Sequence, residues 1–116
     1  MSTTTEYRPD FTSRVRHITQ IMTQAHLAAL VGVSRSSVSR WIDGSDVPSD
    51  TNAAMVLDID YILGQYAQAY PAVRLHDWFV SSNAFLNGAL PRDVLVLEGP
   101  TRVIDALHAE AAGSFA

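Results

Sequence analysis

The sequence predicts an all-α protein. Apolar residues recur at helical spacing through most of the chain, and no stretch of useful length alternates apolar and polar residues as a strand does. Glycine and proline stand between the helical stretches, where they end one helix and begin the next. With 116 residues and a hydrophobic content of 47%, the chain can bury a core as one compact unit or as two small units.

The N-terminal region is expected to begin with a flexible tail over residues 1–9 and to continue as one domain over residues 10–70. Its first helix should run from about Asp10 to Met22. Three polar side chains would face outward from it, namely Arg14, Arg16 and His17. The apolar face would consist of Val15, Ile18, Ile21 and Met22.

Residues 23–44 predict two short helices joined by a tight turn. Thr23 and Ser34 stand where each helix needs an N-cap, and Gly32 lies at the turn, which favours a residue that accepts positive φ. Ala28 lies where the two helices nearly touch. Apolar residues would face inward from both helices: Leu27, Leu30, Val31, Val33, Val38, Trp41 and Ile42. Gly44 and Pro48 then close a unit that is typical of a helix-turn-helix.

An ordinary helical hairpin would use the same glycine and leucines. The outward face of the second helix argues against it, because a plain bundle surface would more often carry Glu/Lys pairs. The pattern T-Q-x-x-L-A-x-x-x-G-V-S-x-x-x-V-S-x-W-x-x-G over residues 23–44 resembles the Cro/repressor (Xre-type) helix-turn-helix family.

This resemblance implies a helix-turn-helix bundle that binds operator DNA as a dimer formed through the N-terminal half. Aligned on the family pattern, the candidate DNA-binding residues are Gln24 at a phosphate, and Arg35, Ser36, Ser39 and Arg40 on the base-facing side. Charge is unevenly spread, because five arginines face four acidic residues in residues 1–46, whereas three face eight in residues 47–116. DNA-binding domains are usually more basic, so a degenerate helix-turn-helix kept as a scaffold is the alternative.

Ser49 stands at the N-cap position of a long central helix that begins with Asp50 and ends at Tyr70-Pro71. Its apolar residues occupy more than one face, so it should pack on two surfaces. Short helices are expected to follow in a C-terminal region over residues 71–116. They are residues 75–80, a capped turn that ends at Gly88, residues 92–97 with Pro91 at the first position, and residues 101–112.

The C-terminal region contains the pattern W-x-x-x-x-N-x-x-L-x-G-x-x-P-x-x-x-L, formed by Trp78, Asn83, Leu86, Gly88, Pro91 and Leu95. So short a segment cannot easily bury this much aromatic and aliphatic mass, which favours an exposed partner surface. The alternative is that these residues cover the central helix. The pattern resembles the C-terminal toxin-binding region of the Xre/MbcA/ParS-type antitoxins of the RES–Xre toxin–antitoxin class.

That resemblance implies a RES-domain toxin as partner, an NAD-depleting enzyme whose active-site cleft the antitoxin covers. The candidate toxin-binding residues are Trp78, Asn83, Phe85, Leu86, Gly88, Pro91, Leu95 and Phe115. Asp105 and Glu110 are the candidates among the acidic residues to face a phosphate-binding cleft, although ordinary exposed helix charges explain them better.

Nothing in the sequence indicates an enzyme, a cofactor or a metal site. There is no cysteine, and the histidines His17, His26, His76 and His108 lack the spacing of metal ligands. No apolar run predicts a membrane span and the N-terminus lacks a secretory signal, so we expect a cytoplasmic bacterial protein. Two alternatives remain: a stand-alone Xre-type repressor whose C-terminal half mediates dimerisation, and an adaptor for another enzyme. The Trp78–Leu95 motif favours the antitoxin, since a simple repressor does not need it.

Overall fold

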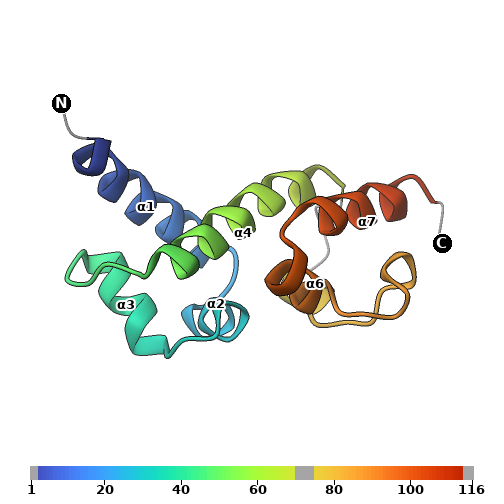
Figure 1. The fold of residues 1–116 in the computed structure, drawn as a ribbon, viewed down its shortest axis with the longest axis horizontal. Helices are drawn as coiled ribbons and strands as arrows, with labels where there is room; N and C mark the ends of the chain where they lie inside the picture. The colour runs from blue at the N-terminus through green and yellow to red at the C-terminus, as the bar shows by residue number, and fades with distance from the viewer. Residues whose placement is uncertain (1–2, 70–74, 114–116) are drawn as a thin grey trace. The chain divides into compact units, whose positions relative to one another are not determined.

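The computed structural model of the chain describes residues 3–69 and 75–113, with side chains described over 11–67 and 75–113. Every regular element in these ranges is helical, so the predicted all-α fold is confirmed (Figure 1). The elements are α1 (Thr3–Thr19), α2 (Gln24–Val31), α3 (Arg35–Asp43), α4 (Asp50–Ala69), α5 (Leu75–Phe79), the 3-10 helix η1 (Ala84–Leu86), α6 (Pro91–Glu98) and α7 (Thr101–Ala111).

The chain forms two compact units, Met1–Asp60 and Tyr61–Ala116, and α4 contributes to both. Asp60 forms an ion pair with Arg14 of α1 at 3.4 Å. Gln65, further along the same helix, lies 3.0 Å from the ring nitrogen Nε2 of His108 in α7. Because each half of α4 packs with its own neighbours, the division lies within the helix rather than after residue 70, where the sequence analysis placed it.

Helix α1 begins earlier than the sequence predicted. It starts at Thr3, so residues 3–9 are helical where a flexible tail was expected. This segment is polar and contains Pro9, and proline lacks the N–H that an interior helical residue donates. A helix of this kind leaves no apolar repeat in the sequence, which is why its first residues could not be recognised from spacing alone.

Helix α1 also ends earlier than predicted, at Thr19 instead of Met22. The Thr19 hydroxyl donates to the Val15 carbonyl at 3.0 Å, and the chain then makes a turn in which the N–H of Ile21 donates to Ile18. Once the chain leaves helical geometry, the helical spacing no longer places side chains. Ile21 is therefore 53% exposed rather than on the apolar face, whereas Met22 is buried.

The core of the first unit forms where α1, α2 and α3 pack together. Phe11 of α1 meets Trp41 of α3 edge to face, with ring centroids 5.8 Å apart. The aliphatic side chains that are buried in this unit include Val15, Ile18, Leu27, Leu30, Val38, Val56 and Ile59. The inner face of α3 is therefore fixed, and only its opposite face meets solvent.

Helices α2 and α3 begin with the caps that the sequence predicted. The Thr23 hydroxyl accepts a hydrogen bond from the N–H of His26, and the Ser34 hydroxyl accepts one from the N–H of Ser37. Gly32 ends α2 in the left-handed region at φ 88°. An L-residue there would be strained, because a left-handed backbone brings its Cβ too close to the carbonyl oxygen.

The end of α3 is held from two sides. Gly44 adopts φ 78°, and its N–H donates to the carbonyl of Arg40. From α1, the Nη2 of Arg16 donates to the carbonyl of Ile42 at 3.0 Å. These bonds satisfy carbonyl groups that the last turn of a helix leaves without partners.

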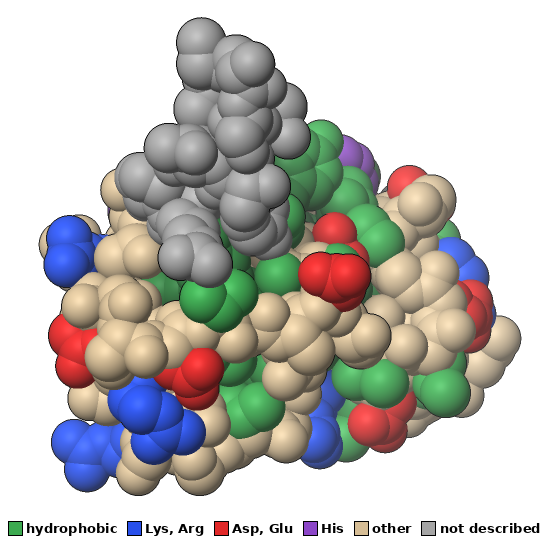
Figure 2. Space-filling view, turned by 60° about the vertical axis from the view of Figure 1, so that its left-hand side comes forward, with side chains coloured by type: hydrophobic (Ala, Val, Ile, Leu, Met, Phe, Trp, Pro, Cys, Tyr) green, Lys and Arg blue, Asp and Glu red, His purple; other side chains and the backbone are tan. Residues whose placement is uncertain are grey.

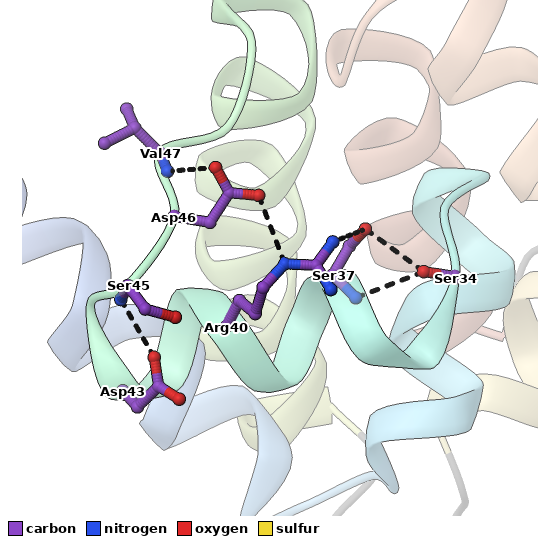
Figure 3. Close-up of polar contacts among 7 residues, drawn as sticks. All are labelled: Ser34, Ser37, Arg40, Asp43, Ser45, Asp46 and Val47. Carbon is purple, nitrogen blue, oxygen red and sulfur yellow. Dashed lines mark hydrogen bonds and ion pairs between the residues drawn. The ribbon is translucent and has the colours of Figure 1, made fainter.

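The turn after α3 also contains a local carboxylate bond, from the Ser45 N–H to Oδ1 of Asp43 at 2.8 Å (Figure 3). The hydrogen bond from the Ser45 hydroxyl, and then that from its N–H, hold the pKa of Asp43 below its ordinary value of 3.8. Both bonds favour the ionised carboxylate, which therefore fastens this turn.

The second unit has its own core, in which α6 packs on α5 and α7, and α7 packs on η1. Trp78 meets Phe79 edge to face at 5.5 Å and Tyr66 of α4 at 6.1 Å. The other buried side chains include Ile62, Leu63, Leu75, Leu86, Val94, Leu95, Val103, Ala106 and Leu107. An aromatic cluster thus lies at the centre of this unit.

A carboxylate from the last helix connects two residues of the C-terminal motif. Glu110 accepts hydrogen bonds from the indole Nε1 of Trp78 at 3.3 Å and from the Nδ2 of Asn83 at 3.4 Å. The Oδ1 of Asn83 accepts from the N–H of Phe85 at 3.0 Å and caps η1. Through Glu110, the buried polar atoms of α5 and η1 are satisfied by α7.

Replacing Asn83 with Ala should lower the free energy of unfolding by about 1–3 kcal/mol, because it removes the cap of η1 and leaves the Glu110 carboxylate short of a donor. Urea unfolding monitored by tryptophan fluorescence measures this change. Asn52→Ala is the matched control, since the Asn52 side chain makes no hydrogen bond with a described side chain. Equal stability of the two variants would contradict a structural role for Asn83.

Replacing Asp43 with Asn should reduce stability at neutral pH and have no effect in strong acid. Because the folded-state pKa is depressed, the stabilisation by Asp43 is present above its ordinary value of 3.8 and is lost as the pH falls through the lowered pKa. The measurement is urea unfolding at a series of pH values, with Asp105→Asn as the control. A difference from wild type that does not vary with pH would show that ionisation of Asp43 plays no part.

Candidate functional site

The outer face of α3 carries the residues that the sequence predicted for DNA contact. Arg35, Ser36, Ser39 and Arg40 are all exposed. Val38 and Trp41 of the same helix are buried, so the two faces are clearly divided. Two guanidinium groups and two hydroxyl groups therefore share one solvent-facing surface, a set that can donate to base edges and phosphates.

Gln24, the fifth predicted residue, is the first residue of α2 and is half-buried. It follows the N-cap Thr23, at the helix end where backbone N–H groups have no intrahelical partners. Gln24 therefore stands at a helix end of the kind that suits a phosphate oxygen.

Arg40 is held by two neighbours that sequence reasoning missed. Its Nε donates to Oδ2 of Asp46 at 3.4 Å, and its Nη2 donates to the Ser37 hydroxyl at 3.3 Å (Figure 3). Ser37 lies one helical turn before Arg40, a spacing that could have been noticed. The contact with Asp46 could not have been predicted from helical spacing, because Asp46 lies beyond Gly44, where α3 ends.

Acidic side chains accompany several of the arginines. Besides the Arg40–Asp46 pair, Arg14 pairs with Asp60 and Arg102 pairs with Glu98. Figure 2 shows one face of the molecule on which arginine side chains stand beside acidic ones rather than forming a continuous basic surface. Any attraction to a phosphate backbone is therefore weakened locally.

The C-terminal motif is mostly inside the second unit, which corrects the expectation of an exposed patch. Trp78 is 7% exposed, and Asn83, Leu86, Pro91 and Leu95 are also buried. The short segment does not bury this mass alone: Tyr66 and the last helix complete the core around it. The alternative weighed from the sequence, that these residues cover the central helix, describes Trp78 correctly.

The remaining predicted toxin-binding residues, Phe85, Gly88 and Phe115, are not part of this buried group. Phe85 is half-buried, and Gly88 is exposed in the turn after η1. Gly88 adopts φ 87° and donates its N–H to the carbonyl of Asn83 at 2.9 Å, so it shapes the turn. Phe115 lies outside the described residues.

The two most exposed of the large apolar side chains described in this unit are different ones, and Tyr61 and Val80 are exposed as well. Leu97 is 81% exposed and Val96 is 60% exposed, both near the end of α6. Four consecutive residues go all the way round a helix, so they cannot all face the core, and Val94 and Leu95 already do. The signal was available as an unbroken apolar run from Val94 to Leu97, which is longer than one face of a helix can bury.

The two acidic residues predicted to face the toxin, Asp105 and Glu110, have different surroundings. Asp105 is exposed on α7, as a residue facing a partner would be. Glu110 instead binds Trp78 and Asn83 inside the unit, so its carboxylate holds the fold together rather than standing ready for a partner.

Among the described residues, no group of His, Cys, Asp and Glu side chains has the arrangement of a metal site. Within the same residues, no helix combines the length and apolar character needed to cross a membrane.

Comparisons with known proteins agree with this arrangement. The helix-turn-helix family matches residues 18–59, which include α2 and α3. A chain in the crystal structure of the M. tuberculosis MbcT–MbcA toxin–antitoxin complex has the same fold, with a TM-score of 0.74 and 26% sequence identity. The match covers 90% of this chain and 96% of that chain. No curated protein sequence matches.

The two matches bear on different parts of the chain. The helix-turn-helix match lies within residues 18–59, whereas the likeness to the antitoxin of the MbcT–MbcA complex extends over both units. They confirm the resemblance that the sequence predicted, to an Xre-type helix-turn-helix region and to the antitoxin of a toxin–antitoxin complex.

Proposed function

We propose that the chain is an antitoxin that binds and neutralises a RES-domain toxin by covering its active-site cleft, so that the toxin cannot deplete NAD. We further propose that it represses its own operon by binding operator DNA as a dimer formed through the N-terminal unit. Both activities take place in the cytoplasm, and the chain itself is not an enzyme and needs no cofactor.

The observation that carries the proposal is the extent of the structural likeness. It covers 90% of this chain, so it includes the C-terminal unit, which a DNA-binding domain alone does not require. A protein that only bound DNA would not need the Trp78–Leu95 motif. Charge supports the same partner, because residues 47–116 are strongly acidic and a cleft that holds phosphate groups is basic.

The contact surface for the toxin is proposed to centre on Val96 and Leu97. Adjacent exposed apolar side chains are typical of protein interfaces, because exposing apolar surface to water is energetically unfavourable in a free monomer. The buried motif residues, Trp78, Asn83 and Leu95 among them, contribute by shaping the unit that presents this surface. Phe85 and the acidic Asp105 are the other partly or fully exposed candidates.

DNA binding is proposed to use the outer face of α3. Arg35 and Arg40 can each make two hydrogen bonds with a guanine in the major groove, while Ser36 and Ser39 are adaptable donors and acceptors. Gln24 would fix the position of the unit on a phosphate. Because acidic side chains stand beside several arginines, binding by one unit should be weak and a dimer on two half-sites should be needed.

Co-expression with the product of the neighbouring open reading frame tests the antitoxin. The neighbour alone should arrest growth and lower cellular NAD, and the wild-type chain should form a stable complex with it and restore both. The variant Leu97→Glu should lose the complex, by about 2 kcal/mol or more in binding free energy, because it places a charge in an apolar contact.

Ile21→Glu is the matched control, since Ile21 is also exposed and apolar but belongs to the first unit. It should protect the cell as wild type does. If the neighbour is harmless, or does not bind the wild-type chain, the antitoxin proposal fails and a stand-alone Xre-type repressor becomes the better description.

Replacing Arg35 and Arg40 with Ala should abolish selective binding to the promoter region of the chain's own operon. Each guanine contact accounts for about 1–3 kcal/mol of discrimination between bases. Fluorescence anisotropy with a promoter duplex and a scrambled duplex measures the selectivity. Arg102→Ala removes one positive charge from the second unit and should leave selectivity unchanged. Unchanged selectivity in the double α3 variant would contradict the proposal.

A further inference from the structure

The side chain of Arg40 is held in place by groups that are themselves held. Asp46 accepts from Arg40 through Oδ2, while its Oδ1 accepts from the N–H of Val47 at 2.8 Å (Figure 3). Ser37 accepts from Arg40, and its hydroxyl lies 3.1 Å from the hydroxyl of Ser34, the N-cap of α3. A chain of polar contacts therefore runs from the loop after α3, through Arg40, back to the start of the helix.

The two contacts occupy one particular edge of the guanidinium. Asp46 binds Nε and Ser37 binds Nη2, and these two atoms form the side edge of the planar group. Among the described residues, nothing hydrogen bonds to Nη1, so the end edge formed by Nη1 and Nη2 keeps outward N–H groups. That edge has the two parallel donors that O6 and N7 of guanine accept.

The Arg40–Asp46 pair contributes little to folding. Both side chains are about half exposed, and an exposed ion pair is screened by water and salt. Its effect should therefore appear in recognition rather than in stability. A long side chain already held in one orientation loses less conformational freedom when it binds, which favours the one arrangement for which it is held.

We infer that Asp46 is a positioning residue that determines the sequence specificity of α3, by holding the side edge of Arg40 so that its end edge faces a guanine. The inference rests on the proposed DNA binding. Asp46 has two opposing effects on binding: its charge repels phosphates and weakens contact with any DNA, while its hold on Arg40 favours the correct base. Removing the charge should therefore raise the affinity for DNA of any sequence and lower the preference for the correct base.

The test uses the full-length chain and a randomised duplex library, from which wild type selects its preferred sequence. Binding constants are then measured for the selected duplex and for a scrambled duplex of the same composition. In Asp46→Asn, whose amide oxygen can still accept from the N–H of Val47, binding to the scrambled duplex should tighten. The ratio of selected to scrambled affinity should fall by about threefold to tenfold.

Asp50→Asn is the matched control, because it removes the same charge from the exposed start of α4, just after the same loop, and among the described residues no hydrogen bond or ion pair joins Asp50 to Arg40. It should tighten scrambled binding and leave the ratio unchanged. In an Arg40→Ala background, adding Asp46→Asn should no longer lower the ratio, because Asp46 acts through Arg40.

The inference is overturned if Asp46→Asn tightens both duplexes equally, which would make Asp46 only a repulsive charge. It is also overturned if the ratio falls just as far in the Arg40→Ala background. If wild type selects no sequence at all, the proposed DNA binding fails, and this result is distinct from the first two because it needs no Asp46 variant.

Discussion

Burial of one face of α3 is the constraint on which the first unit depends. Trp41 and Val38 are buried against α1 and α2, and the ring of Phe11 closes over Trp41. Removing an indole and an isopropyl group from water is worth several kcal/mol, far more than any polar contact on the opposite face. The helix therefore cannot rotate, and its charged face is presented to solvent in one fixed orientation.

In the second unit, burial constrains polar groups as well as apolar ones. Its motif contains an indole N–H and an amide that become buried, and both would be costly without partners. The carboxylate of Glu110 satisfies them together, so α7 is tied to the segment that contains the motif. Most of the motif is thus required by the fold, and the surface that can meet a partner lies on neighbouring positions such as Val96 and Leu97.

Acidic residues give the DNA-binding face a character different from that of a strongly basic domain. Asp46 beside Arg40 and Asp60 beside Arg14 reduce long-range attraction to phosphates, which acts on any sequence alike. What remains is short-range recognition by oriented donors. Under the proposed DNA binding, this arrangement favours selectivity over affinity, and a second copy or a bound partner would restore the affinity.

The sequence by itself determined the all-α class and the caps and turn of the helix-turn-helix, because these depend on local rules: Thr23, Gly32 and Ser34 act within one turn of their own position. It also determined the outer face of α3, since helical spacing fixes which side chains share a side. It did not determine where α1 begins and ends. Only the tertiary structure decided that Trp78 and Leu95 are buried, that Glu110 faces inward and that Asp46 reaches Arg40. Each of these depends on residues that are brought together from different helices or across a turn, and the periodicity of the sequence does not predict such contacts.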